Sequence, residues 1–345
     1  MCVWCAYTGK QEAAPLLLQW GRRIEGLWSG YYSGLVTQDD NGLHWAKTTG
    51  CLRFWEQKFR VQDYPGTTGL WHSRTNSGGD ERFAHPFVGT RGIVGLVGQG
   101  NDGVYSSRKQ IHTDLMNRCL HEGMCFPSAT EPMGSKYNVL DNGKQIHCSD
   151  FTAQLVEREY LRSGDALQAI RSTFTQYQEE AANIMVFKDQ PGRIYFETTS
   201  QRILLAHYAD GIALTICALA FGRPAPQCMQ IPVNSVGYAD ADGTVHIETL
   251  SPIFADIDSC MPDGCLAAAR QYLREHGPSS LAHLCDGAIA PRFPKNAVAH
   301  SKAIAAYRTL ETLFCNDEIE LLPQEATNPA NGITGRYDLL KLLHP

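Results

Sequence analysis

Apolar residues in this chain follow two patterns: short continuous runs, and positions spaced three and four residues apart. Short apolar runs are typical of buried strands, and here they predict strands over residues 2–7, 30–36, 43–46, 92–100, 181–187 and 193–197. Helical spacing predicts helices over residues 12–26 and 109–123 and from residue 163 onwards. Turns at 39–42 and 189–192 join successive strands, so we expect largely antiparallel sheets rather than a doubly wound parallel sheet.

The pattern changes after residue 250. Apolar residues at helical spacing predict helices over residues 265–273 and 297–314. Residues 250–345 are therefore expected to form a mostly helical extension to the mixed fold.

One predicted strand ends at Arg74 and opens into a glycine-rich loop that contains Thr75, Ser77 and Gly78. The planar guanidinium of arginine binds a carboxylate through two parallel hydrogen bonds, and a nearby hydroxyl and loop amides can satisfy its remaining lone pairs. This pattern indicates a carboxylate-binding site. The alternative is an ordinary surface arginine ahead of a turn.

The second residue of the chain is a cysteine. Removal of Met1 would leave Cys2 with a thiol and a free α-amino group, so that one residue would hold both a nucleophile and a base. The alternative is an incidental cysteine at this position.

Composition narrows the class of protein. The chain has 345 residues, of which 43% are hydrophobic and 19% charged, so it can bury a large core in two or three domains. Its net charge of −6 gives no reason to expect nucleic acid or an anionic membrane as a partner. Twelve cysteines, no secretory leader and no apolar run near ~20 residues predict a cytoplasmic protein.

Several sequence blocks occur together in a recognisable order, at residues 2–9, 14–18, 23–27, 30–34, 73–79 and 84–87. They resemble the glutaminase domain of glucosamine-6-phosphate synthase, a class II glutamine amidotransferase of the N-terminal nucleophile hydrolase superfamily. The resemblance covers about residues 2–249. It implies an α+β fold, a four-layer αββα sandwich with helices outside two stacked sheets.

The resemblance also assigns catalytic roles. Cys2 takes the place of the nucleophile, and Gln99 with Gly100 takes the place of the Asn-Gly pair that forms the oxyanion hole. A glutamine keeps a side-chain amide donor, and a glycine allows close backbone approach. Gly98 or Asn101 would take this role if the loop shifted by one or two residues.

The resemblance also implies which residues bind the substrate. Arg74 and Ser77, with Thr75 and Gly78 beside them, are expected to hold the α-carboxylate of glutamine, and Glu131 its α-ammonium group. The chain departs from the family here: Thr75 replaces an aromatic residue, Gly78 a histidine and Glu131 an aspartate. Next to the nucleophile, Val3 replaces a glycine.

The function implied is hydrolysis of the glutamine side-chain amide through a Cys2 thioester. The ammonia would pass to an acceptor on another chain, because residues 250–345 leave no room for the sugar-phosphate isomerase module of the synthases. We expect L-glutamine as substrate, an ammonia-accepting enzyme or subunit as partner, and no cofactor or metal, and we also consider a homodimer. The alternatives are an amidase of the same superfamily acting on another amide and a glutamine-sensing module with little activity.

Other groups of cysteine and histidine residues give weaker evidence for a site. The spacing of Cys2 and Cys5 suits a redox or metal pair, but no second pair follows at zinc spacing. Cys119, His121 and Cys125 would need a fourth ligand. We therefore predict no metal site.

Overall fold

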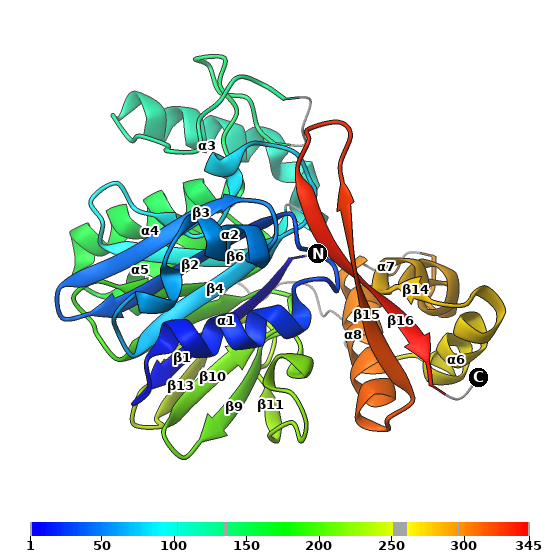
Figure 1. Ribbon diagram of the computed structural model, residues 1–345. Helices are drawn as coiled ribbons and strands as arrows, with labels where there is room; N and C mark the ends of the chain where they lie inside the picture. The colour runs from blue at the N-terminus through cyan, green and yellow to red at the C-terminus, as the bar shows by residue number, and fades with distance from the viewer. Residues whose placement is uncertain are drawn as a thin grey trace.

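The computed structural model describes residues 2–101, 103–133, 137–250, 261–295, 297 and 299–343. Two antiparallel sheets stack face to face, and helices cover their outer faces (Figure 1). Apolar side chains from both sheets fill one shared core, for example Val36, Leu70, Val97 and Ile184. The predicted four-layer αββα sandwich is confirmed.

The first sheet carries the start of the chain. Its strands are β11 (Cys228–Gln230), β9 (Leu204–Tyr208), β10 (Gly211–Thr215), β1 (Val3–Gly9), β4 (Thr68–Arg74), β2 (Tyr32–Asp39) and β3 (Gly42–Thr49), in spatial order. The amphipathic helix α1 (Ala13–Ile24) covers β1 and β4, and α2 (Leu52–Lys58) packs beside it. Gly21 lets α1 approach closely, because a Cβ there would lie 2.7 Å from the ring of Trp71.

The second sheet has the order β13 (Val245–Thr249), β12 (Ser235–Asp240), β8 (Arg193–Thr198), β7 (Glu180–Phe187), β6 (Val94–Asn101) and β5 (Phe87–Val88). Helices α4 (Cys148–Ser163) and α5 (Ala166–Gln176) cover its outer face, and α3 (Lys109–His121) packs against α4. The pattern of apolar residues did not predict α4. Its N-terminus is capped by the His147 ring, whose Nδ1 accepts a hydrogen bond from the Ser149 amide.

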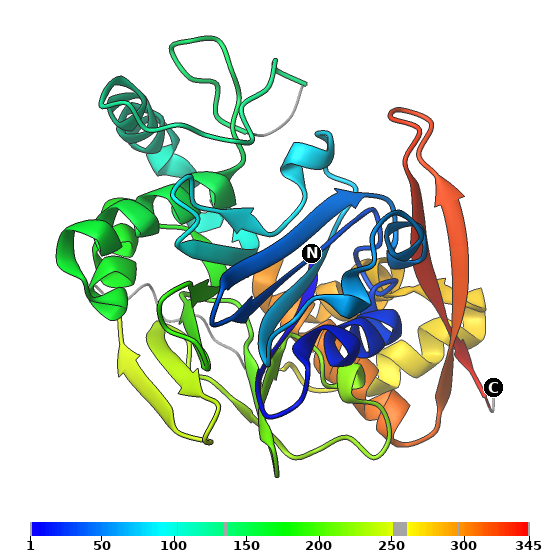
Figure 2. The ribbon, with the colours of Figure 1, turned by 60° about the vertical axis from the view of Figure 1, so that its left-hand side comes forward.

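The C-terminal region contains the predicted helices, now bounded as α6 (Cys265–His276) and α8 (Ala299–Cys315), and the short α7 (Leu281–Leu284). It also contains a sheet that the sequence analysis missed, made of β14 (Ser279–Ser280), β16 (Thr334–Leu342) and β15 (Ile319–Thr327). Figure 2 shows the β15–β16 hairpin beside α1.

Hydrogen bonds and apolar contacts join the C-terminal region to the sandwich. The amides of Arg336 and Asp338 on β16 donate hydrogen bonds to the carbonyls of Gly30 (3.1 Å) and Gly26 (2.8 Å). Buried residues of α6 and α8 belong to the same apolar core as β1 and α1. The extension is therefore continuous with the core of the sandwich.

Across the described segments, no helix is both long and apolar enough to cross a membrane.

Candidate active site

The pairing of β1 with β4 sets the geometry of the site. Val3 lies opposite Ser73 in the antiparallel register. One residue further along this register, Cys2 directly precedes β1 and Arg74 ends β4. The charge of Cys2 is among the interactions that raise the pKa of Arg74. The structure thus brings the predicted nucleophile and the predicted carboxylate-binding group together.

Arg74 is buried, with 1% of its surface exposed. Its Nη1 donates to the carbonyl oxygen of Gly78 (2.9 Å) and its Nη2 to the hydroxyl of Tyr137 (2.5 Å). The guanidinium lies 4.6 Å from the ring centroid of Tyr32 and 5.9 Å from those of Phe83 and Tyr137. Three aromatic rings therefore enclose the cation, although Thr75 supplies none.

No ion pair with a carboxylate involves Arg74 within the described part of the chain. Burial lowers its pKa, but the negative charges that Tyr137, Tyr32 and Cys2 carry when deprotonated outweigh burial and raise it. The side chain is therefore a buried permanent cation whose hydrogen-bond partners, the Gly78 carbonyl and the Tyr137 hydroxyl, are neutral at neutral pH. Such a group is costly to bury unless an anion joins it.

The loop after β4 folds back over Arg74. Thr75 Oγ1 donates to Ser77 Oγ (3.1 Å), and the Ser77 side chain hydrogen-bonds to the hydroxyl of Tyr137. Gly78 has φ of +85°, a left-handed conformation that favours glycine. Gly78 thus contacts the guanidinium directly, Ser77 reaches it through Tyr137, and Thr75 contacts Ser77. Their role in holding a substrate carboxylate stays a prediction.

Tyr137 is a site residue that the sequence analysis missed. It follows the long segment after α3, and its hydroxyl contacts both Arg74 and Ser77. Nothing in the local spacing around it marks this role, because the contact joins residues 63 positions apart.

Gln99 and Gly100 lie near the end of β6, close to this cluster. The His72 ring, on β4, donates from Nε2 to the carbonyl of Gly98 (3.0 Å), which ties the end of β6 to the strand that carries Arg74. Gln99 is buried, and its Nε2 donates to Gln201 Oε1 (3.0 Å).

Gly100 occupies a position that only glycine fits. Its φ is +142°, and a Cβ there would lie 2.1 Å from the carbonyl oxygen of Glu180. At the alternative position, Gly98, a Cβ would lie 2.4 Å from Asn183 Oδ1. The side chain of Asn101, the other alternative, lies outside the described part of the structure.

Glu131 is not brought to the cluster. Its side chain is 77% exposed and forms an ion pair with Lys144. None of its described contacts reaches Cys2 or Arg74. The predicted acceptor for an α-ammonium group therefore lacks support in this geometry.

Three buried histidines pack behind Arg74. The ring centroids of His72 and His85 are 3.8 Å apart, and those of His85 and His147 are 5.3 Å apart. Burial lowers the pKa of all three rings, to about 3 for His72, and the charge of Arg74 lowers each further. The rings are therefore neutral at neutral pH and add no competing positive charge.

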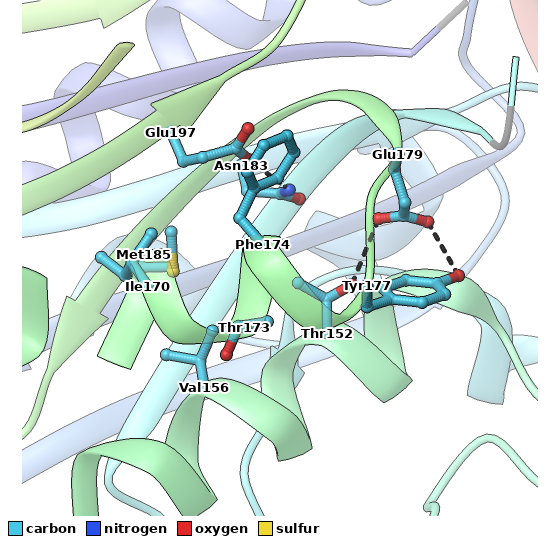
Figure 3. A pocket seen from close by; sticks show the side chains of 10 residues that line it. All are labelled: Thr152, Val156, Ile170, Thr173, Phe174, Tyr177, Glu179, Asn183, Met185 and Glu197. Atoms are coloured by element: carbon cyan, nitrogen blue, oxygen red, sulfur yellow. Dashed lines mark hydrogen bonds between the residues drawn. The ribbon is translucent and has the colours of Figure 1, made fainter. Parts of the chain in front are cut away.

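A small internal cavity lies on the other face of the second sheet, between β7, β8, α4 and α5 (Figure 3). Glu197 Oε2 accepts a hydrogen bond from Asn183 Nδ2 (2.9 Å). Burial raises the pKa of Glu197 to about 8, and the nearby charge of Glu179 adds to this effect. Asn183 pairs with Gly98, so this polar group supports β6 just before Gln99.

Cys5, the partner of Cys2 in the spacing noted above, is a weak candidate for a further site. Cys5 is buried in β1, and burial raises its pKa to about 12, which makes it a poor nucleophile or metal ligand. Among the described residues, no group of three or more His, Cys, Asp or Glu side chains is placed to hold a metal ion.

Comparison with known proteins adds relatives in sequence and in fold, although no family model matches the chain. The glutamine--fructose-6-phosphate aminotransferase of Chlorobaculum tepidum is 32% identical over 136 residues, which are 38% of this chain and 21% of that enzyme. The enzyme of the same name from Clostridium tetani is 23% identical over 197 residues, which are 56% of this chain and 28% of that enzyme. The match thus spans about a quarter of the length of these relatives.

Among solved structures, the glutamine phosphoribosylpyrophosphate amidotransferase of B. subtilis, complexed with ADP and GMP, is similar with a TM-score of 0.58. The identity is 15%, and the alignment covers 95% of this chain and 68% of that one. At this identity the likeness establishes the fold. In sequence, part of the chain is thus similar to part of the glutamine--fructose-6-phosphate aminotransferases, and in fold the chain is similar to the glutamine phosphoribosylpyrophosphate amidotransferase.

Proposed function

We propose that this chain hydrolyses the side-chain amide of a small carboxylate-bearing substrate, L-glutamine first among them, with Cys2 as the nucleophile. The observation that carries the proposal is the buried Arg74, which has no carboxylate partner among the described residues and stands across the strand pair from Cys2.

A substrate carboxylate would complete the environment of Arg74. It would accept two parallel hydrogen bonds from the guanidinium and one from the Ser77 hydroxyl, in place of the single bond to Tyr137. The aromatic rings around Arg74 exclude water, which strengthens this ion pair. A substrate anchored in this way extends its amide towards Cys2.

The chemistry then follows from Cys2 once Met1 has been removed. The thiol proton moves to the α-amine of the same residue, and the sulfur attacks the amide carbon. Gln99 and the Gly100 amide would stabilise the oxyanion, and the amine returns the proton to the departing nitrogen, so that ammonia leaves. Water, deprotonated by the same amine, then attacks the thioester, which releases the carboxylic acid and regenerates the thiol.

The names of the relatives suggest a use for the ammonia. They are an aminotransferase and an amidotransferase, and the chain matches only part of the aminotransferases. We therefore propose that the ammonia passes to an acceptor enzyme or subunit. Co-purification with that acceptor and transfer of ¹⁵N from amide-labelled glutamine would test this step, and release of all the label into bulk solvent would refute it.

A second candidate is hydrolysis of a related amide that lacks an α-ammonium group. The exposed Glu131 favours it, because its ion pair is with Lys144 and none of its described contacts reaches Arg74.

Acid quenching during turnover tests both candidates. Protein that begins at Cys2, as verified by intact mass, is mixed with L-glutamine or with glutaramate, which has the same carbon skeleton without the α-amine. A thioester on the Cys2 peptide with L-glutamine supports the first candidate, and an adduct with glutaramate alone supports the second. An adduct with neither, from correctly processed protein, would refute the proposal.

A further inference from the structure

The helix α8 of the C-terminal region reaches the candidate active site through Tyr307. This residue is fully buried, and its ring packs edge-on against Trp28 with the centroids 5.3 Å apart. The negative charges of Cys217 and Cys2 help burial to raise the pKa of its phenol well above the usual value. The geometry agrees, because β10 runs antiparallel to β1 and leads into Ala218, whose amide donates a hydrogen bond to Glu311 on α8 (2.8 Å). Tyr307, one turn before Glu311, therefore lies at the end of the sheet where Cys2 stands.

The hydroxyl of Tyr307 has no hydrogen-bond partner in the described structure. A buried hydroxyl without a partner is destabilising, and in native proteins such groups usually find a partner in a ligand, a water or a second state of the site. Trp28 contacts the ring of Tyr307, and no hydrogen bond joins it to the hydroxyl.

The same helix supports the other side of the site. Glu311 lies one turn beyond Tyr307 and binds Arg202 through two hydrogen bonds of 2.9 Å. Arg202 follows Gln201, which accepts the hydrogen bond from Gln99. One face of α8 thus reaches both the Cys2 side and the Gln99 side of the cluster.

We propose that Tyr307 is an active-site residue supplied by the C-terminal region, whose hydroxyl donates a hydrogen bond to the sulfur of Cys2 when the thiol loses its proton. The bond forms directly or through one water molecule. The proposal rests on the proposed function only in taking Cys2 as the nucleophile. It makes Tyr307 a positioning residue for the thiolate, and it makes the C-terminal region a part of the active site.

The conservative variant Tyr307→Phe removes only the oxygen atom. We expect its melting temperature to equal or exceed that of the wild type, because an unpaired buried hydroxyl is lost. The alkylation of Cys2 by iodoacetamide, followed by mass spectrometry of the N-terminal peptide, should slow about tenfold at pH 7. Its rise with pH should move to higher pH, since the thiolate has lost a donor.

Tyr64→Phe is the matched control. Tyr64 is partly buried against the same core, and none of its described interactions involves Cys2. It should leave the alkylation profile unchanged. An unchanged profile in Tyr307→Phe would overturn the proposal, and so would a variant that fails to fold, since the hydroxyl would then have a structural partner. Alkylation requires no glutamine turnover, so an inactive wild type would refute the proposed function and leave this test intact.

Discussion

Arg74 donates a hydrogen bond from Nη2 to the hydroxyl of Tyr137 over 2.5 Å, and the same hydroxyl bonds to Ser77. Tyr137 thus occupies the two groups that we assign to a substrate carboxylate. It therefore competes with the substrate or gives way to it when the substrate binds.

The variant Tyr137→Phe shows whether the Tyr137 hydroxyl competes with the substrate carboxylate or helps to bind it. If the hydroxyl competes for Arg74 and Ser77, its loss should lower KM about three- to tenfold, with little change in kcat. Steady-state kinetics of amide hydrolysis measure both constants. A raised KM would show instead that the hydroxyl helps to bind the substrate.

Arg74→Lys should lower kcat/KM by about 10- to 100-fold, because a lysine cannot offer the planar pair of donors to a carboxylate. The effect should appear mainly in KM, since the carboxylate lies away from the reacting amide. Arg60→Lys is the control, as the Arg60 side chain is 86% exposed. Equal kinetics for the two variants would rule out Arg74 as the carboxylate anchor.

The buried histidines should make the fold sensitive to acid. Burial lowers the pKa of His72 to about 3, whereas in the unfolded chain it is near ~6.5. The unfolded state therefore binds more protons between these values, and stability falls as the pH drops below ~6.5. The loss for one such residue is about 1.4 kcal/mol per pH unit.

Melting temperatures measured from pH 7.5 to 5 would test this dependence. His85→Leu removes one of the three rings and should flatten the decline. His121→Gln removes an exposed histidine, with 67% of its side chain in solvent, and should not. The same slope in both variants would contradict the account.

The buried Glu197 should make the stability of the fold depend on pH in the opposite direction, with a loss at high pH. Its pKa is about 8 in the folded protein against an ordinary glutamate value of 4.5, so the folded state holds the proton more tightly. The stability that this proton provides is complete below pH ~4.5 and is lost as the pH rises through 8. Glu197→Gln should raise the melting temperature at pH 9 relative to wild type and change it little at pH 5.5. The exposed Glu275→Gln is the control, and an equal effect in both variants would refute the assignment.

Local patterns were enough to predict much of this fold. The apolar runs of β1, β4, β6 and β7, the spacing in α1 and the hairpin turn between β2 and β3 all depend on neighbouring residues. The strand end at Arg74 followed from the same kind of local pattern, whereas the role of Gly100 was implied by the family resemblance, and both roles stay predictions.

The contacts that complete the site were not predictable locally. Tyr137, Gln201 and Tyr307 reach it only through tertiary packing, across long separations in the chain. The β15–β16 hairpin was missed because its strands are half exposed and Pro323 interrupts one of them, although Asn331-Gly332 is a turn signal between them.

The most direct test of the account is the rate of glutamate and ammonia release from L-glutamine by protein that begins at Cys2, compared with Cys2→Ala of the same melting temperature. We predict steady turnover by the first protein and none above background by the second. Undiminished turnover in Cys2→Ala would contradict the central claim that the thiol of Cys2 attacks the amide.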